Sequence, residues 1–146
     1  MTTRTGGCRC GQVRFEITTA PMLTMACHCK GCQRMTGGPY SLSVAVAPDG
    51  FAVTQGEPVI GGVGEPPMHF HCPDCMSWLF TRPRGAPFVN VRSPMLDDPS
   101  GLEPFIETCA SNAFPFAKTG APHSFAEFPP MEAYQALIGE FAGAKT

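Results

Sequence analysis

The motif Cys8-Arg9-Cys10 near the beginning of the sequence and the motif Cys72-Pro73-Asp74-Cys75 near its middle together offer four thiols. In an extended chain, residues i and i+2 point to the same face, so both cysteines of the first motif can reach one ion. Zinc–sulfur bonds of about 2.3 Å place tetrahedral sulfurs roughly 3.8 Å apart, a gap that both C-x-C and C-x-x-C spacings bridge. The two motifs therefore predict a closed, structural zinc site that ties the start of the chain to its middle.

A third motif, Cys27-His28-Cys29-Lys30-Gly31-Cys32, lies between the other two. Its spacing predicts that Cys27 and Cys29 share one strand face, with Cys32 following one turn later. Such a compact set needs no distant fourth ligand, so we expect a second zinc ion with one position open to water or a substrate thiolate. An ion of this kind is a mild Lewis acid that holds and deprotonates a thiol. This spacing predicts a catalytic zinc.

The spacing leaves other assignments open. A side chain elsewhere in the chain would close the second site and make all of the clustered cysteines structural. The candidates for that closure are Cys109, His69, His71 and His123. Regrouping the middle motif with Cys72 leaves poorer ligand sets, and disulfides are less typical of clustered cysteines in a cytosolic chain. Cys109 is expected to be a buried core thiol, and His28 is expected to point away from the metal.

Length and composition favour one mainly β domain over residues 1–146. The chain of 146 residues is long enough for a single hydrophobic core. Glycine and proline number 16 each, about twice average usage, which favours short strands and turns over a helical bundle. A net charge of −2 gives no positive field to attract nucleic acid, and no apolar run is long enough to span a membrane. The first residues lack the apolar run of a signal peptide, so we expect a cytoplasmic protein.

Alternation of apolar and polar residues predicts short strands throughout the chain. The predicted strands cover residues 13–17, 42–46, 51–54, 68–72, 78–81, 88–91 and 105–108. The segments 68–72 and 78–81 flank Cys72 and Cys75 like the two strands of a zinc-ribbon hairpin, and residues 61–67 are predicted to form a loop. Pro129-Pro130 opens the one predicted helix. The apolar stripe of that helix consists of Met131, Tyr134, Leu137, Ile138 and Phe141.

The cysteine motifs, together with their neighbours, resemble the glutathione-dependent formaldehyde-activating enzyme (GFA) family. The segments that resemble its three signatures are Gly7-Cys8-Arg9-Cys10-Gly11-Gln12-Val13-Arg14-Phe15, Cys27-His28-Cys29-Lys30-Gly31-Cys32-Gln33-Arg34 and Phe70-His71-Cys72-Pro73-Asp74-Cys75. Residues 51–57 resemble the segment that links these signatures in the family. The resemblance covers about residues 5–82 well and the remainder loosely.

The resemblance implies a mainly β, Mss4-like fold of several curled antiparallel sheets stapled by zinc, with a short C-terminal helix. This type of fold is shared with small zinc-binding GTPase chaperones and with centromere protein V. The resemblance also implies two zinc ions per chain. The structural ion would be bound by Cys8, Cys10, Cys72 and Cys75, and the catalytic ion, which is the more labile, by Cys27, Cys29 and Cys32. The activity ascribed to the family is condensation of formaldehyde with glutathione, a carbon–sulfur lyase reaction in reverse.

Two features of the sequence depart from the family pattern. Met76 stands where the family usually has glycine, and a turn with positive φ would be strained by methionine, so we expect a different turn there. The segment Phe114-Pro115-Phe116 stands where the family often has tryptophan after a proline. The candidates for binding the carboxylates of glutathione, by chain position alone, are Arg9, Lys30 and Arg34.

Our primary hypothesis is a zinc-dependent carbon–sulfur lyase of the S-(hydroxymethyl)glutathione synthase type. Such an enzyme would form or cleave the adduct of a thiol, glutathione above all, with a small aldehyde such as formaldehyde. The alternatives are a non-enzymatic, zinc-stapled binding module and a thiol or zinc sensor. No nucleic-acid or membrane partner is expected, and a homo-oligomer is compatible with the sequence.

Overall fold

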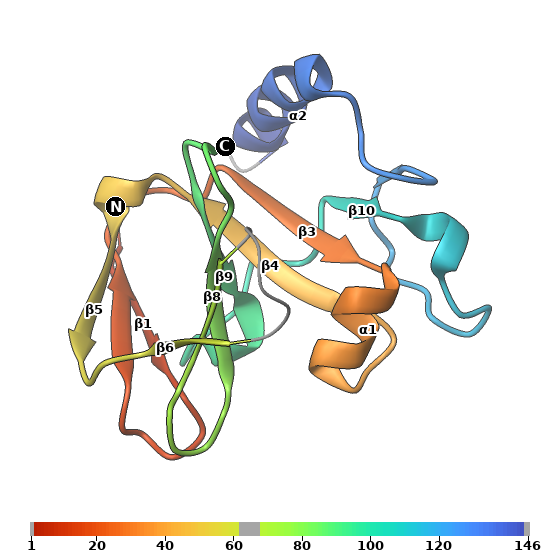
Figure 1. Cartoon of the computed structure of the whole chain (residues 1–146). Helices are drawn as coiled ribbons and strands as arrows, with labels where there is room; N and C mark the ends of the chain where they lie inside the picture. Colours follow the sequence, from red (N-terminus) through yellow and green to blue (C-terminus); the bar gives the residue numbers. More distant parts are fainter. Residues whose placement is uncertain (1, 62–67, 145–146) are drawn as a thin grey trace.

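The computed structural model describes residues 2–61 and 68–144, which form a mainly β fold with two α-helices (Figure 1). The strands are β1 (Arg4–Gly7), β2 (Arg14–Ile17), β3 (Leu23–Cys27), β4 (Ser41–Val46), β5 (Phe51–Gln55), β6 (Val59–Gly61), β7 (Met68–His71), β8 (Trp78–Arg82), β9 (Val89–Arg92), β10 (Ile106–Thr108) and β11 (His123–Ser124). The helices are α1 (Lys30–Thr36) and α2 (Met131–Ala144), and short 3-10 turns cover Pro48–Gly50, Ser93–Met95 and Ala110–Asn112. The loop predicted over residues 61–67 lies, from residue 62 on, outside the described residues.

The strands form two sheets. The smaller sheet has the order β1-β2-β5 and is antiparallel, whereas the larger has the order β11-β10-β3-β4-β9-β8-β7-β6. Figure 1 shows β3 running diagonally across the molecule toward α1 and β4 returning beside it in the opposite direction. Most neighbours in the larger sheet are antiparallel, as expected, but β10 runs parallel to both β3 and β11. The chain reaches β10 through a long connection and not through a hairpin, which permits the parallel direction.

The main hydrophobic core lies between the smaller sheet and strands β4, β8 and β9 of the larger one. The ring centroid of Phe80 lies 4.7 Å from that of Phe51 and 4.6 Å from that of Phe70. Phe15 of β2 and Val44 of β4 are buried in the same cluster. The apolar residues that alternate in the sequence therefore face this core, which confirms the strands predicted from them.

Helix α2 covers a second hydrophobic cluster beside β3 and β10. Leu137 and Phe141 pack there against Leu23 and Ile106. The helix begins directly after Pro129-Pro130, as predicted. Met131 was predicted to belong to the apolar stripe of this helix, but its side chain is 79% exposed and takes no part in the cluster.

Helix α1 was not predicted, and neither were β1, β3, β6 and β11. Cys29 is the N-cap of α1, where its sulfur accepts a hydrogen bond of 3.3 Å from the backbone N–H of Cys32. The helix ends after seven residues at Gly37, whose φ of 66° suits glycine. The prediction that Cys27 and Cys29 share a strand face is wrong, because Cys27 is the last residue of β3. A helix this short has too few turns to show an amphipathic period.

In the part of the chain that the structure describes, no helix combines the length and the apolar character needed to cross a membrane.

Candidate metal centres

One face of the larger sheet is apolar, whereas the other carries the apolar residues Leu23, Ala45 and Ile106 under α2 and, beyond them, a row of polar residues. On the apolar face Val44 pairs with Val91, which pairs with Phe80. Neighbouring residues on the same strands point the other way, because side chains alternate along a strand. The register aligns on that side Thr108, Cys27, Ser41, Ser43, Arg92, Asn90, Thr81 and His69, which together we call the polar face. Buried polar side chains gathered on one face of a sheet indicate a functional site.

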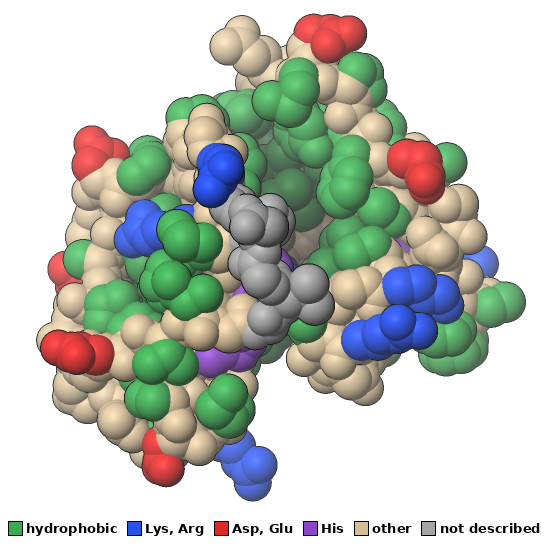
Figure 2. Space-filling model, in the orientation of Figure 1, with side chains coloured by type: hydrophobic (Ala, Val, Ile, Leu, Met, Phe, Trp, Pro, Cys, Tyr) green, Lys and Arg blue, Asp and Glu red, His purple; other side chains and the backbone are tan. Residues whose placement is uncertain are grey.

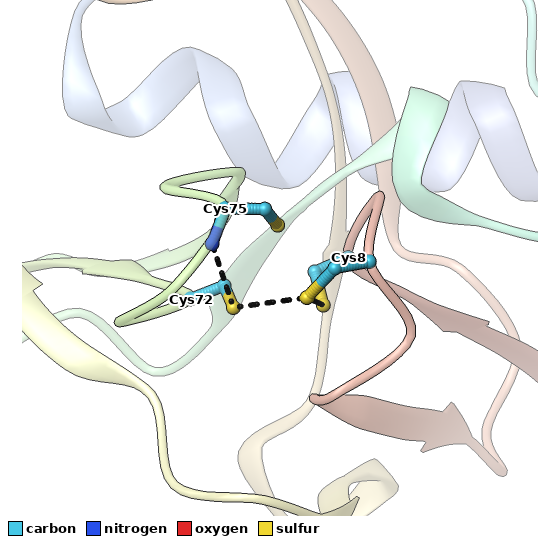
Figure 3. Close-up of side chains that lie close together, drawn as sticks. Cys8, Cys72 and Cys75 are labelled. Atoms are coloured by element: carbon cyan, nitrogen blue, oxygen red, sulfur yellow. Dashed lines mark hydrogen bonds between the residues drawn. The ribbon is translucent and has the colours of Figure 1, made fainter.

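Four cysteines from two distant loops converge in the structure, and Figure 3 shows three of them, Cys8, Cys72 and Cys75. Cys8 and Cys10 lie between β1 and β2, and Cys72 and Cys75 lie between β7 and β8, with all four sulfurs within 4.8 Å of one another. The Sγ–Sγ distances are 3.6 Å for Cys8–Cys10 and 3.7 Å for Cys10–Cys72. These distances are close to the roughly 3.8 Å expected around a tetrahedral zinc ion. The predicted four-cysteine group is thus brought together, and it links the two sheets.

The three cysteines of the middle motif form a second group. The sulfurs of Cys27, Cys29 and Cys32 lie within 4.8 Å of one another, at the junction of β3 and α1. Within residues 2–61 and 68–144, no further His, Cys, Asp or Glu atom joins this group at that spacing. Soft thiolate donors at this spacing fit zinc, and a set of three leaves one of its four positions open.

The thiols of Cys27 and Cys32 influence each other strongly. The pKa of Cys27 is lowered, first by the hydrogen bond from Cys32 and further by contacts with Thr108 and Cys29, although burial opposes this shift. The pKa of Cys32 is raised by the same hydrogen bond and by burial. Cys27 is therefore the thiolate of the pair and Cys32 the donor. Because metal ions bind thiolates, the site already favours one deprotonated ligand.

Cys109 lies directly after β10, beside the three-cysteine group. Its side chain is buried, which confirms the prediction of a buried thiol. Burial, followed by the negative charge of Cys27 and a hydrogen bond with it, raises the pKa of Cys109 to about 12. Cys109 is nonetheless not among the sulfurs that share the 4.8 Å spacing.

The buried side chain of His28 anchors the loop that carries Cys27 and Cys29. The His28 ring is completely buried, Nε2 lies 2.9 Å from Oε1 of Glu107, and the ring edge contacts Tyr40. The side chain of Gln33 donates hydrogen bonds to the backbone oxygens of His28 and Asn112, at 2.8 and 3.0 Å. These contacts fix the backbone on which the sulfurs are mounted. Sequence reasoning placed His28 outside the ligand set but missed this buried anchoring role.

The histidines considered for closing the second site lie elsewhere. His69 on the polar face forms a hydrogen bond of 2.9 Å through Nδ1 with Oγ1 of Thr81. His71 is buried, which lowers its pKa. Nε2 of His123 on β11 lies 2.6 Å from Oε2 of Glu140 on α2. No histidine of the described residues therefore joins the three-cysteine group.

Met76 follows the four-cysteine turn in a left-handed conformation, with φ of 62°. Its backbone N–H donates a hydrogen bond of 3.0 Å to the oxygen of Cys72. The expectation of a different turn is therefore wrong. The turn keeps positive φ, and methionine carries a steric cost that glycine would avoid.

A cavity of about 360 Å³ lies beside the polar face, between α1 and the turn that carries Cys72 and Cys75. Residues from several elements line it, among them Met35, Thr36, Tyr40, Met76, Trp78 and Arg92. Arg92, on the same sheet face as Cys27, lines the cavity, whereas Cys27, Cys29 and Cys32 do not.

The fold and the two sulfur groups define a mainly β protein with two cysteine clusters that could hold zinc. The chain belongs to the glutathione-dependent formaldehyde-activating enzyme family, whose sequence pattern matches residues 3–112. The matched segment contains all seven clustered cysteines and ends before α2.

Among solved structures, a crystal structure of a Rhodobacter sphaeroides protein is similar to this chain. The TM-score is 0.52 at 20% sequence identity, covering 64% of this chain and 87% of that protein. At this level of identity the likeness supports the fold alone. A search of curated proteins found no match.

Proposed function

We propose that this protein is a zinc-dependent carbon–sulfur lyase that joins a thiol to a small aldehyde at the three-cysteine group and cleaves the adduct in reverse. Glutathione and formaldehyde are the proposed substrates, because the family is described by them. One observation carries the proposal. Cys27, Cys29 and Cys32 converge without a fourth ligand atom from the described residues, whereas the other group has four sulfurs. A three-ligand set is typical of catalytic zinc and a four-cysteine set of structural zinc.

A zinc ion bound by three thiolates supplies a position at which a further thiol is held in its deprotonated form. Strand β3 and helix α1 position the three sulfurs, and the contact between His28 and Glu107 holds the loop between them. In the forward reaction the substrate sulfur forms a bond to the carbonyl carbon, and the carbonyl oxygen takes the proton that the thiol lost. We expect most of the acceleration to come from positioning the two reactants and from forming the thiolate at neutral pH.

Cys8, Cys10, Cys72 and Cys75 are assigned to a structural zinc ion. Four thiolates leave no open position for a substrate. The group connects the loop between β1 and β2 with the turn between β7 and β8, so an ion there would cross-link the two sheets. Since a metal that binds only the folded state stabilises it, chelation should lower the unfolding temperature.

Elemental analysis combined with a rate measurement tests the proposal. The wild type should contain two zinc ions per chain and accelerate the exchange of ¹³C-formaldehyde with glutathione, followed by NMR. The Cys29→Ala variant should keep its circular dichroism spectrum, lose one zinc ion and lose the acceleration. Full activity in a folded Cys29→Ala variant would refute the proposal.

Cys109→Ser is the matched control, because it removes a buried thiol outside the ligand set. This variant should retain both zinc ions and the activity. Loss of one zinc ion from Cys109→Ser would mean that a fourth thiol closes the second site, which contradicts an open catalytic position.

Exposed aromatic side chains favour a zinc-stapled interaction module as the second candidate. Phe114 and Phe116 stack with ring centroids 5.3 Å apart, and Phe116 is 76% exposed. An inert second zinc ion, whose coordination does not respond to glutathione, would favour this candidate over the enzyme.

A further inference from the structure

Arg92 is a buried cation on the same sheet face as the three-cysteine group. It pairs with Ser43 of β4, and Ser41, two residues earlier on that strand, pairs with Cys27. Paired residues and residues two apart point to the same face of a sheet. Strand spacings near 4.8 Å and rises near 3.4 Å place the Cα atoms of Cys27 and Arg92 roughly 12 Å apart across β4. The guanidinium itself lies over β8, the neighbour of β9 on the side away from β4, and it lines the cavity together with Met35 and Thr36 of α1, the helix that carries Cys32.

The guanidinium group of Arg92 is fixed on one side by Trp78 and Thr81. Its central carbon lies 3.9 Å from the centroid of the Trp78 ring, and Nη2 donates a hydrogen bond of 3.3 Å to Oγ1 of Thr81. The same hydroxyl accepts a hydrogen bond of 3.2 Å from Nε1 of Trp78 and contacts Nδ1 of His69. These contacts hold the cation in one orientation, which lowers the entropy cost of binding a ligand there.

Arg92 has no acidic partner within the described residues. Its Nε atom is buried without a hydrogen-bond partner, and no described Asp or Glu forms an ion pair with it. A buried arginine is normally paired, because an unpaired charge and an unsatisfied donor are both costly. A buried guanidinium that lines a cavity and has no carboxylate partner among the described residues indicates a site for an anion.

The electrostatic surroundings connect Arg92 to the metal group. Burial lowers the pKa of Arg92 to about 10, and Cys32, Cys27 and Cys29, in their thiolate forms, oppose that shift. The guanidinium therefore lies within electrostatic reach of all three sulfurs. A ligand that bridges the two groups would present its sulfur at one end and its anion at the other.

The basic residues of α1 are weaker candidates for binding an anion. Figure 2 shows basic side chains over α1 at the surface of the molecule. Lys30 is exposed, and its Nζ lies 3.4 Å from Oε1 of Gln33 and 5.5 Å from the centroid of the Phe114 ring. Arg34 is exposed as well. Solvent screens exposed charges, so ion pairs with these residues contribute little to affinity.

We propose that Arg92 binds a carboxylate of the thiol substrate, so that the site selects thiols carrying a carboxylate over neutral ones. The proposal rests on the proposed function and specifies the substrate class of the same site. Glutathione meets this requirement. A planar guanidinium suits a carboxylate because it can donate two parallel hydrogen bonds.

The test compares glutathione with its dimethyl ester, which has the same thiol but no carboxylate. Dissociation constants for both are measured by calorimetry with the zinc-loaded protein at fixed pH and salt. The wild type should bind glutathione at least about tenfold more tightly than the ester, as a buried charge-assisted pair implies. In Arg92→Gln the two affinities should become equal. A variant that discriminates as strongly as the wild type would overturn the proposal.

Arg82→Gln is the matched control. Arg82 is also a cation on the larger sheet, but its guanidinium lies over the rings of Phe51 and Phe80 and not in the cavity. This variant should keep the tenfold preference. If Arg92→Gln does not fold, Lys30→Gln and Arg34→Gln decide the question. Retention of the preference in both supports Arg92, and its loss in either overturns the proposal.

Formation of S-hydroxymethylglutathione, measured on the same preparations, separates this inference from the proposed function. If the preference for glutathione over its ester depends on Arg92 but the protein does not accelerate the reaction, the proposed carboxylate site is supported and the proposed enzymatic function is refuted. If the protein accelerates the reaction but the preference for glutathione is unchanged in Arg92→Gln, the proposed enzymatic function is supported and the proposed carboxylate site is refuted.

Discussion

Replacing Met76 with glycine should stabilise the protein by about 0.5–1 kcal/mol. A residue other than glycine in the left-handed region costs roughly 1–2 kcal/mol, and Met76 has φ of 62°. Substituting glycine removes that cost, but it also stabilises the unfolded state by roughly 0.5–1 kcal/mol, because glycine has more conformational freedom there. The methionine side chain is 58% exposed, so its removal sacrifices little buried apolar surface. The backbone hydrogen bond to the oxygen of Cys72 needs no side chain and should persist.

Urea unfolding of the zinc-loaded protein measures this effect, with Met76→Ala as the matched control. Alanine also removes the long side chain but keeps the Cβ atom that makes positive φ unfavourable. The glycine variant should therefore be more stable than both the alanine variant and the wild type, with unchanged zinc content. A glycine variant no more stable than the alanine variant would show that the left-handed conformation carries no cost, and the reasoning would be wrong.

Two further predictions concern contacts away from the sulfurs. The hydrogen bonds from Arg14 are the largest cause of the lowered pKa of Asp97. Because the pKa of this carboxyl is lower in the folded than in the unfolded state, the contact stabilises the fold above about pH 4 and is lost as the pH falls through the folded value. The difference in unfolding midpoint between the wild type and Asp97→Asn should therefore be constant near neutral pH and shrink below about pH 4; a difference that does not shrink contradicts this. Gln33→Ala removes both hydrogen bonds to backbone oxygens beside the three-cysteine group and should cost about 2 kcal/mol in urea unfolding. Arg34→Ala, on the exposed side of the same helix, should be nearly neutral, and equal effects of the two substitutions would contradict the anchoring role of Gln33.

The sequence by itself determined the sulfur groups and much of the sheet. The spacings C-x-C and C-x-x-C set how far apart two sulfurs can lie, whatever the rest of the chain does. Alternation along residues 13–17 and 42–46 identified two strands of the core, because a side chain's face is a local property of an extended chain. Helix α1 escaped detection, because its seven residues carry no periodic signal and its cap is a cysteine.

Only the tertiary structure decided what surrounds the sulfurs. Arg92 lies 60 residues or more after the middle motif in the sequence, and it shares a face with Cys27 only because β4 lies between β3 and β9 in the register observed. Cys109 lies beside Cys27 because β10 runs parallel to β3. Strand order and register follow from burying the apolar faces of the whole chain at once, so no local pattern reveals them. The cysteine groups could therefore be predicted from spacing, whereas Arg92 and the cavity that it lines depend on long-range packing.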